Sequence, residues 1–311
     1  MRTVIETLLP IFGIVFLGFV AARRSALHPY AVQGLSVFVF NFSVPCLLFR
    51  SLARAELSES LPWSFLAAYY VGAVAVFAGA ALVSRVLFHR PPVEQVLSGF
   101  GASYGNTVLL GIPIVLTAYG EAASIPLFLI IAFHSPILVT GTTLLVEMAR
   151  GRSGDTRHAR RAILRSTVAN PIVLGVVLGA AVNVASVPVP TAADRLLALL
   201  GQAAAPAALF ATGASLAAYR LAGALAESSA WVALKLVVHP LLVYLMCRLL
   251  AIETLWTQVA VTVAALPAGV NAYLFAQRYE TGVRAATTTV FLSTLVSAVT
   301  LSILLWVFHA Q

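Results

Sequence analysis

Long apolar segments separated by short polar connections run along the whole chain. Most of the segments have about 20 residues or more, which is the length that an α-helix needs to cross the hydrocarbon core of a bilayer. The pattern predicts ten membrane-spanning helices. They are Val4–Ala21, Val32–Leu52, Trp63–Phe88, Val93–Tyr119, Ile125–Ala149, Ile163–Val184, Thr191–Ala217, Trp231–Leu250, Leu255–Arg278 and Val283–Phe308.

Two of these segments contain residues that interrupt a helix near its centre. In the ninth segment, Pro267 lacks a backbone N–H and Gly269 adopts almost any backbone angle. The fourth segment contains the range Gly105–Thr107, followed by Gly111 and Pro113. An interrupted helix is tolerated at membrane depth where its freed backbone groups line a cavity, and a pair of such helices points to a transporter binding site. We therefore expect segments four and nine to be broken and to cross at a binding site.

Arginine is unevenly distributed among the connections. Most arginines lie in the odd-numbered connections, and the longest of these, residues 150–161, divides the chain almost in half. Because positively charged loops stay on the cytoplasmic side, we expect the odd connections in the cytoplasm and both termini outside the cytoplasmic (inner) membrane. The predicted organisation is a five-helix repeat at 1–149, a cytoplasmic linker at 150–161 and a second repeat at 162–311, together forming a single membrane domain.

Short patterns recur between the two halves at one spacing. The pattern around Pro10 recurs around Pro171, and the pattern around Pro45 recurs around Pro206, in both cases after 161 residues. Because each half has an odd number of spans, the second half is predicted to be inverted relative to the first, as in carriers that work by alternating access. The prolines of the two broken segments are 154 residues apart, so the crossing helices require a gap between the repeats.

Composition agrees with a chain embedded in a membrane. Hydrophobic residues make up 60%, charged residues 10%, and the mean hydropathy is +0.96, whereas soluble domains are close to half apolar and a quarter charged. The fold class is therefore an all-α integral membrane protein with the lipid bilayer as its surroundings. The net charge of +8 comes from loop arginines, so no nucleic acid partner is expected. Cys46 and Cys247 lie inside apolar segments, and no catalytic or metal motif is present, so we expect a protein that is not an enzyme and has no cofactor or metal.

The residues at the two breaks suggest an anion site. The N-terminus of a half-helix carries about half a positive charge and unsatisfied N–H groups, which favour an anion. Asn106 and Asn271 lie close to the breaks, and their carboxamides can donate to a carboxylate. The alternative is that both asparagines only cap the broken helices.

Other polar residues inside the segments are weaker candidates. Asn41, Pro45, Pro206 and Thr212 could line the same cavity, although packing between helices explains them as well. Intramembrane His134, Lys235 and His239 form a possible proton relay. The competing interpretations are packing histidines and a lysine that snorkels to the cytoplasmic surface. No aspartate or glutamate falls in the middle of a segment, which argues against a carboxylate-built sodium site.

These motifs together resemble the auxin efflux carriers, a family that includes the plant PIN transporters and many bacterial members. The matching residues are Gly105-Asn106-Thr107, Gly111-Ile112-Pro113, Leu266-Pro267, Asn271-Ala272, Ala276-Gln277-Arg278-Tyr279, Asn41, Pro45, Phe49 and the run from Ala208 to Leu216. The resemblance covers the chain from the second segment to the ninth. It implies two inverted five-helix repeats, as in the bile-acid symporter and sodium/proton antiporter folds, and an elevator-like movement of a transport domain against a scaffold.

The resemblance also implies roles for single residues. Pro113 and Pro267 would mark the crossover, together with Gly111 and Gly269, and Asn106 and Asn271 would bind the substrate carboxylate. The flanking residues Gly105, Thr107 and Val270 belong to the same expected site. The short central loop gives no support for regulation through a large cytoplasmic loop.

The leading hypothesis is a secondary carrier for a small organic anion, such as a carboxylate or an auxin-like acid. Bacterial members of the family are associated with malate or malonate, so the resemblance implies a small organic anion of this kind as the substrate and not auxin itself. Two alternatives remain open: a membrane receptor or signalling scaffold with the same fold, and a sodium-coupled symporter. A homodimer is a further possibility.

Overall fold

The computed structural model describes residues 2–55, 62–151, 170–219 and 223–309. Within these ranges every regular element is a helix, apart from one isolated antiparallel bridge between Gly105 and Ala268. The predicted linker therefore lies outside the described residues from position 152 onwards, and so does the start of the sixth segment.

Six helical stretches are long and apolar enough to cross a membrane by length and composition. Four shorter apolar helices match the remaining predicted spans at Leu9–Arg23, Thr107–Tyr119, Pro171–Val184 and Thr254–Ala264. The prediction of an all-α integral membrane protein is confirmed. The six long stretches are α2 (Pro29–Phe38) with η1 (Val39–Ser43) and α3 (Val44–Ala53); α4 (Trp63–Val86); η3 (Glu121–Ala123) with α7 (Ser124–Ala149); α10 (Thr191–Gln202) with α11 (Ala204–Leu216); α12 (Leu225–Ala233) with η4 (Leu234–Val238) and α13 (His239–Leu249); and α16 (Val283–His309).

The other helices contribute the N-terminal helix, the sixth segment and the two interrupted segments. They are α1 (Arg2–Arg23), α5 (Pro92–Ser103), η2 (Thr107–Gly111) with α6 (Ile112–Tyr119), α9 (Pro171–Val184), α14 (Thr254–Ala264) and α15 (Asn271–Arg278).

Three of the prolines within helical stretches closely follow a π-helical segment. Pro45, Pro113 and Pro240 each follow a π-helical segment, η1, η2 and η4 respectively. Proline removes one helical hydrogen bond and its ring crowds the preceding turn, and a π-segment widens the helix at that point. Pro113, which was expected to mark the crossover, therefore lies beyond it, in the second half of a segment whose break comes earlier at Tyr104–Asn106.

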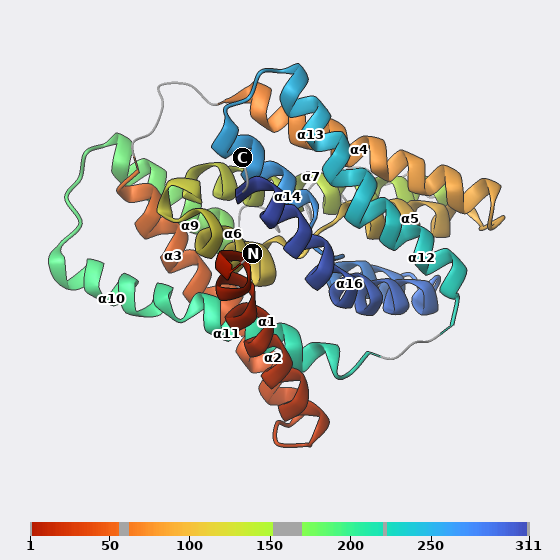
Figure 1. The fold of residues 1–311 in the computed structure, drawn as a ribbon, viewed down its shortest axis with the longest axis horizontal. Coiled ribbons are helices and arrows are strands. Elements are labelled where there is room, and N and C mark those ends of the chain that lie inside the picture. The colour runs from red at the N-terminus through yellow and green to blue at the C-terminus, as the bar shows by residue number, and fades with distance from the viewer. Residues whose placement is uncertain (1, 56–61, 152–169, 220–222, 310–311) are drawn as a thin grey trace.

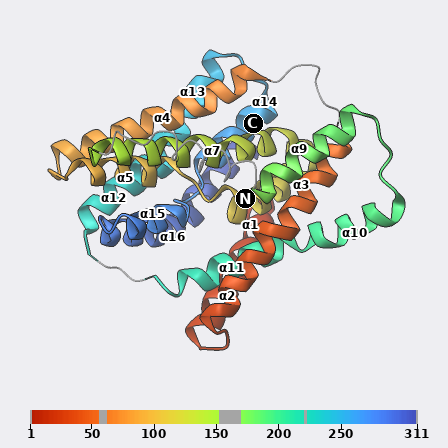
Figure 2. The same cartoon turned by 180° about the vertical axis from the view of Figure 1, so that it is seen from behind.

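Two groups of helices make up the molecule. Helices α1 to α3 lie with α9 to α11 on one side, while α4, α5, α7, α12, α13 and α16 lie on the other, as Figures 1 and 2 show from opposite directions. Helix α6 reaches from the second group toward α1 and α11 in the first. The crossing segments thus lie where the two groups meet.

Glycines allow very close helix contacts in the first group. A Cβ atom on Gly18 of α1 would collide with the carbonyl oxygen of Phe210 in α11. A Cβ on Gly179 of α9 would lie 2.6 Å from the carbonyl oxygen of Phe49 in α3. Small residues let helix backbones approach in this way inside a bilayer, where packing rather than water exclusion holds helices together.

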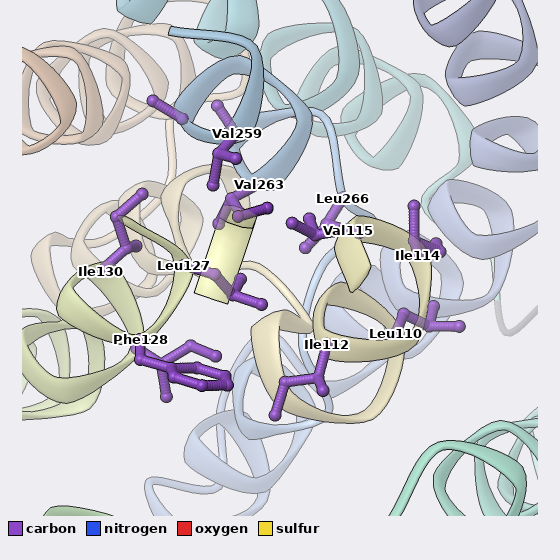
Figure 3. Close-up of a cluster of buried hydrophobic side chains, with 14 of the residues drawn as sticks. Leu110, Ile112, Ile114, Val115, Leu127, Phe128, Ile130, Val259, Val263 and Leu266 are labelled. Carbon is purple, nitrogen blue, oxygen red and sulfur yellow. The ribbon is translucent and has the colours of Figure 1, made fainter. Parts of the chain in front are cut away.

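A buried apolar cluster fixes the second half of the fourth segment. Figure 3 shows buried side chains of η2, α6, α7, α14 and the loop after α14, which lie around α6. Each is at most 1% exposed. Because α6 is anchored here against α7 and α14, the break that precedes it is held in one place. The labelled residues are Leu110, Ile112, Ile114, Val115, Leu127, Phe128, Ile130, Val259, Val263 and Leu266.

Candidate functional site

The two interrupted segments cross through a short antiparallel contact. Helix α5 ends at Ser103 and η2 begins at Thr107, while α14 ends at Ala264 and α15 begins at Asn271. In the gaps, the Asn106 N–H donates to the Pro267 carbonyl oxygen at 2.9 Å, and the Gly269 N–H donates to the Tyr104 carbonyl oxygen at 2.9 Å. The expected breaks in segments four and nine are therefore present, and each satisfies backbone groups of the other.

Local conformation explains the glycine in this contact. Tyr104 leaves α5 in an extended conformation, with φ −80° and ψ 111°, and its ring covers the opposing strand-like segment. A Cβ on Gly269 would lie 2.7 Å from a ring carbon of Tyr104. Only glycine leaves room for the tyrosine ring at this point.

A cavity of about 810 Å³ opens beside the crossover. Its lining includes the whole predicted binding set, with Asn41 and Gly269 in addition, and no charged side chain among the described residues. The first residues of two half-helices, Thr107 and Asn271, are part of the wall, so the N-termini of two half-helices, which carry partial positive charge, border the cavity. The predicted residues in the lining are Gly105, Asn106, Thr107, Val270 and Asn271.

Several lining residues were not predicted. Asn170 caps α9, where its side-chain oxygen accepts a hydrogen bond from the Ile172 N–H, and the residue lines the cavity. Tyr104 and Ser135 also line the cavity. Asn170 immediately precedes a proline at a helix start, so a capping pattern in the sequence could have identified it. The other unpredicted polar residues in the lining are Gln33 and Ser36, and Ser215 of the seventh segment, expected with Thr212 to face the cavity, lines it as well.

A hydrogen-bonded group of three side chains borders the cavity. The Asn271 Nδ2 donates to the Tyr104 hydroxyl oxygen at 2.8 Å. The same hydroxyl lies 2.9 Å from Ser135 Oγ in α7. The crossover, α7 and α15 are therefore joined at one tyrosine oxygen.

The predicted ionisable residues His134 and Lys235 contact the crossing segments, and neither they nor His239 are among the residues that line the cavity. The Gly105 N–H donates to His134 Nε2 at 3.2 Å. Lys235 Nζ donates to the carbonyl oxygen of Ala264, the last residue of α14, and lies 3.3 Å from His239 Nδ1. Lys235 is 0% exposed, so the interpretation as a snorkelling lysine is wrong. Its ammonium instead meets the negative C-terminal end of a half-helix.

The remaining predicted residues are placed away from the central cavity. Thr212 Oγ1 donates to the Ala208 carbonyl oxygen within α11. Pro113 lines a separate cavity of about 320 Å³, together with Arg50 and Glu121. Pro45, Pro206, Gly111 and Pro267 do not line the central cavity, as far as the described residues show. Among those residues there is also no group of three His, Cys, Asp or Glu side chains that could hold a metal ion.

An all-helical membrane protein in which two broken helices cross beside a polar cavity has the architecture of a membrane transporter. Comparison with known sequences agrees, because the profile of the family described as "Membrane transport protein" matches residues 3–305. The chain belongs to this family, which is that of the auxin efflux carriers, and the resemblance noted in the sequence is confirmed.

Three relatives illustrate the range of the family. A protein of Rhizobium meliloti (strain 1021) named "Putative malonate transporter" is 32% identical over 312 residues, covering 100% of this chain and 97% of that protein. The "Uncharacterized transporter YfdV" of Escherichia coli (strain K12) is 26% identical over 224 residues, or 69% of each chain. The "Auxin efflux carrier component 8" of Arabidopsis thaliana is 29% identical over 161 residues, or 48% of this chain and 42% of that protein.

Proposed function

We propose that the protein is a secondary carrier that moves a small organic anion, in particular a carboxylate, across the cytoplasmic membrane. The observation that carries this proposal is the central cavity, where the carboxamides of Asn106 and Asn271 and two half-helix N-termini face one space. N–H donors and positive helix ends stabilise a carboxylate without a full countercharge. The name of the Rhizobium relative makes malonate the first anion to test.

An elevator-type movement of two inverted repeats is part of the proposal. The glycine contacts support it, because Gly18 and Gly179 are 161 residues apart and their partners Phe49 and Phe210 are also 161 apart. Two halves related by a two-fold axis make each contact between them twice, once in each direction. The Gly18–Phe210 and Gly179–Phe49 contacts are such a pair. Gly105 and Ala268, which pair at the centre of the crossing contact, are 163 residues apart. This spacing is close to the 161 residues of the repeat, so the two repeats need only a small gap at the crossing segments.

The test is flux in liposomes containing purified protein. Labelled malonate should enter under an imposed gradient, and replacing sodium with another monovalent cation should have little effect. Asn106→Ala removes a donor to the anion, and because a hydrogen bond to a charged group is worth about 1.5–3 kcal/mol, the apparent affinity should weaken about 10-fold or more.

Asn271→Asp is the stricter variant, because it keeps the side-chain shape and sets a negative charge against the anion. A control of the same type is Asn183→Asp, since Asn183 lies at the far end of α9, donates to the carbonyl oxygens of Leu52 and Ala55 and does not line the cavity. It loses both of these hydrogen bonds, so its Tm is measured beside its affinity. Unchanged affinity in a folded, inserted Asn271→Asp protein at neutral pH would remove the proposed binding role. Binding of malonate without flux under every gradient would indicate a receptor, and loss of uptake without sodium would indicate a sodium symporter.

A further inference from the structure

We propose that Ser135 is a further ligand-binding residue and that the Tyr104 hydroxyl is a positioning group that directs both Ser135 and Asn271 toward the bound anion. The proposal rests on the proposed function, because it concerns the same cavity and assumes an anion there. It adds a third element, α7, to a site otherwise built from the crossing segments.

The Tyr104 ring is held firmly in its place. Its centroid lies 4.7 Å from that of Phe100 and 4.6 Å from that of His134, and the residue is 7% exposed. Its carbonyl oxygen also accepts the Gly269 N–H at 2.9 Å. The position of the hydroxyl is therefore set by packing and by the crossover itself, and not by the two side chains that it contacts.

Either oxygen of the Tyr104–Ser135 pair can donate, and the proposal assigns the donor role to Tyr104. The Tyr104 oxygen accepts from Asn271 Nδ2 at 2.8 Å, which leaves the single hydroxyl hydrogen to be placed elsewhere. Ser135 Oγ at 2.9 Å can accept it. The hydrogen of Ser135 is then directed away from Tyr104, and the second N–H of Asn271 is also unused in this pair of contacts.

Both remaining hydrogens belong to residues that line the cavity. A carboxylate has two acceptor oxygens, so an amide N–H from α15 and a hydroxyl from α7 can each bind one of them. A fixed pair of donors binds an anion with less loss of side-chain freedom than two independently rotating groups. The Tyr104 hydroxyl is what fixes the pair.

Tyr70 shows how a buried tyrosine with only a structural hydrogen bond differs from Tyr104. Its hydroxyl donates to the Ile130 carbonyl oxygen at 2.7 Å, joining α4 to α7, and it does not line the central cavity. Tyr70→Phe is therefore a matched control for Tyr104→Phe, because each change removes one hydroxyl hydrogen-bonded inside the protein and keeps the ring.

The experiment measures malonate uptake in proteoliposomes and separates apparent KM from maximal rate. We expect Ser135→Ala to raise the KM about 10-fold, the effect of losing one hydrogen bond to a charged group. Tyr104→Phe should raise the KM about 5- to 10-fold with little change in maximal rate, while Tyr70→Phe should leave the KM unchanged. Adding Tyr104→Phe to Asn271→Ala should raise the KM by less than about 2-fold, because the two changes disrupt one coupled unit.

The outcomes separate this inference from the proposed function. If Asn271→Ala weakens malonate uptake but both Tyr104→Phe and Ser135→Ala behave as the parent protein, the positioning role is wrong and the carrier proposal stands. Additive effects in the double variant would also overturn the positioning role. If no variant of the cavity changes uptake, or no carboxylate is transported, the proposed function itself fails. Should Tyr104→Phe not fold, the Ser135→Ala measurement still decides whether α7 contributes to binding.

Discussion

Gly269→Ala is the change whose effect follows most directly from the crossover geometry. The added Cβ would lie 2.7 Å and 2.8 Å from two ring carbons of Tyr104 and 3.1 Å from the Gly105 carbonyl oxygen. Carbon atoms pack best at about 3.5–4.0 Å, so the ring would have to retreat by about 1 Å. Phe100 and His134 occupy the space next to the ring, which restricts this retreat.

The consequences should appear in both stability and affinity. Overpacking of this kind costs about 1–3 kcal/mol. A ring displaced by about 1 Å also loses good geometry for the hydroxyl contacts to Asn271 and Ser135, which now measure 2.8 and 2.9 Å. Thermal unfolding of the purified protein in detergent should therefore occur at a lower Tm, and the KM for malonate should rise about 5- to 10-fold.

Gly79→Ala is the matched control. Gly79 lies within α4, and a Cβ there would have nothing within 4 Å. Alanine in an open helical position stabilises by about 0.5–1 kcal/mol, so this variant should keep its KM and unfold at an equal or higher Tm. If Gly269→Ala matched Gly79→Ala in both measurements, the close contact between the crossing segments would not constrain the site, and the reasoning would be refuted.

Three further changes test other parts of the structure. Gly213→Ala should strongly lower the Tm, because its Cβ would collide with the backbone carbonyl of Val15 in α1 and neither helix can give way locally; an unchanged Tm would contradict the α1–α11 contact. Lys235→Ala should destabilise the protein by about 1–3 kcal/mol, since the buried Ala264 carbonyl oxygen loses its donor; a lysine at the surface would show no such loss of Tm. A cysteine appended after Gln311 should react with an impermeant thiol reagent added outside intact cells, and reaction only after permeabilisation would reverse the proposed orientation.

Length, hydropathy and the helix-breaking residues were sufficient to predict the crossing of two broken segments. A proline and glycines at mid-segment leave few alternatives, and the asparagines beside them are the obvious polar groups. The same reasoning misplaced Pro113, because a proline can be accommodated by a π-helical turn as well as by a break. Sequence alone does not distinguish the two, since both begin with the loss of one backbone hydrogen bond.

Contacts between distant segments account for what the sequence could not predict. Lys235 lies near the end of its predicted segment, and only the course of α14 shows that its ammonium has a buried acceptor. Ser135 looks like an ordinary small residue of an apolar helix until Tyr104 is seen beside it. Such partners depend on which helices become neighbours, and local periodicity contains no information on that.

The backbone groups of the crossover indicate which helices must accompany the site if it moves. In a bilayer every N–H and C=O needs a partner, because a group left unsatisfied costs about 1–3 kcal/mol inside the protein and several kcal/mol in the hydrocarbon. The crossing segments satisfy two of their N–H groups through each other, but Gly105 relies on His134 of α7 and Ala268 on Ser293 of α16, while the end of α14 relies on Lys235 of η4. A displacement of the crossover that left any of these helices behind would expose at least one polar group to hydrocarbon. If the binding site moves, α7, η4 and α16 must therefore move together with the crossing segments. An elevator-type carrier requires this, because its transport domain moves as one rigid body.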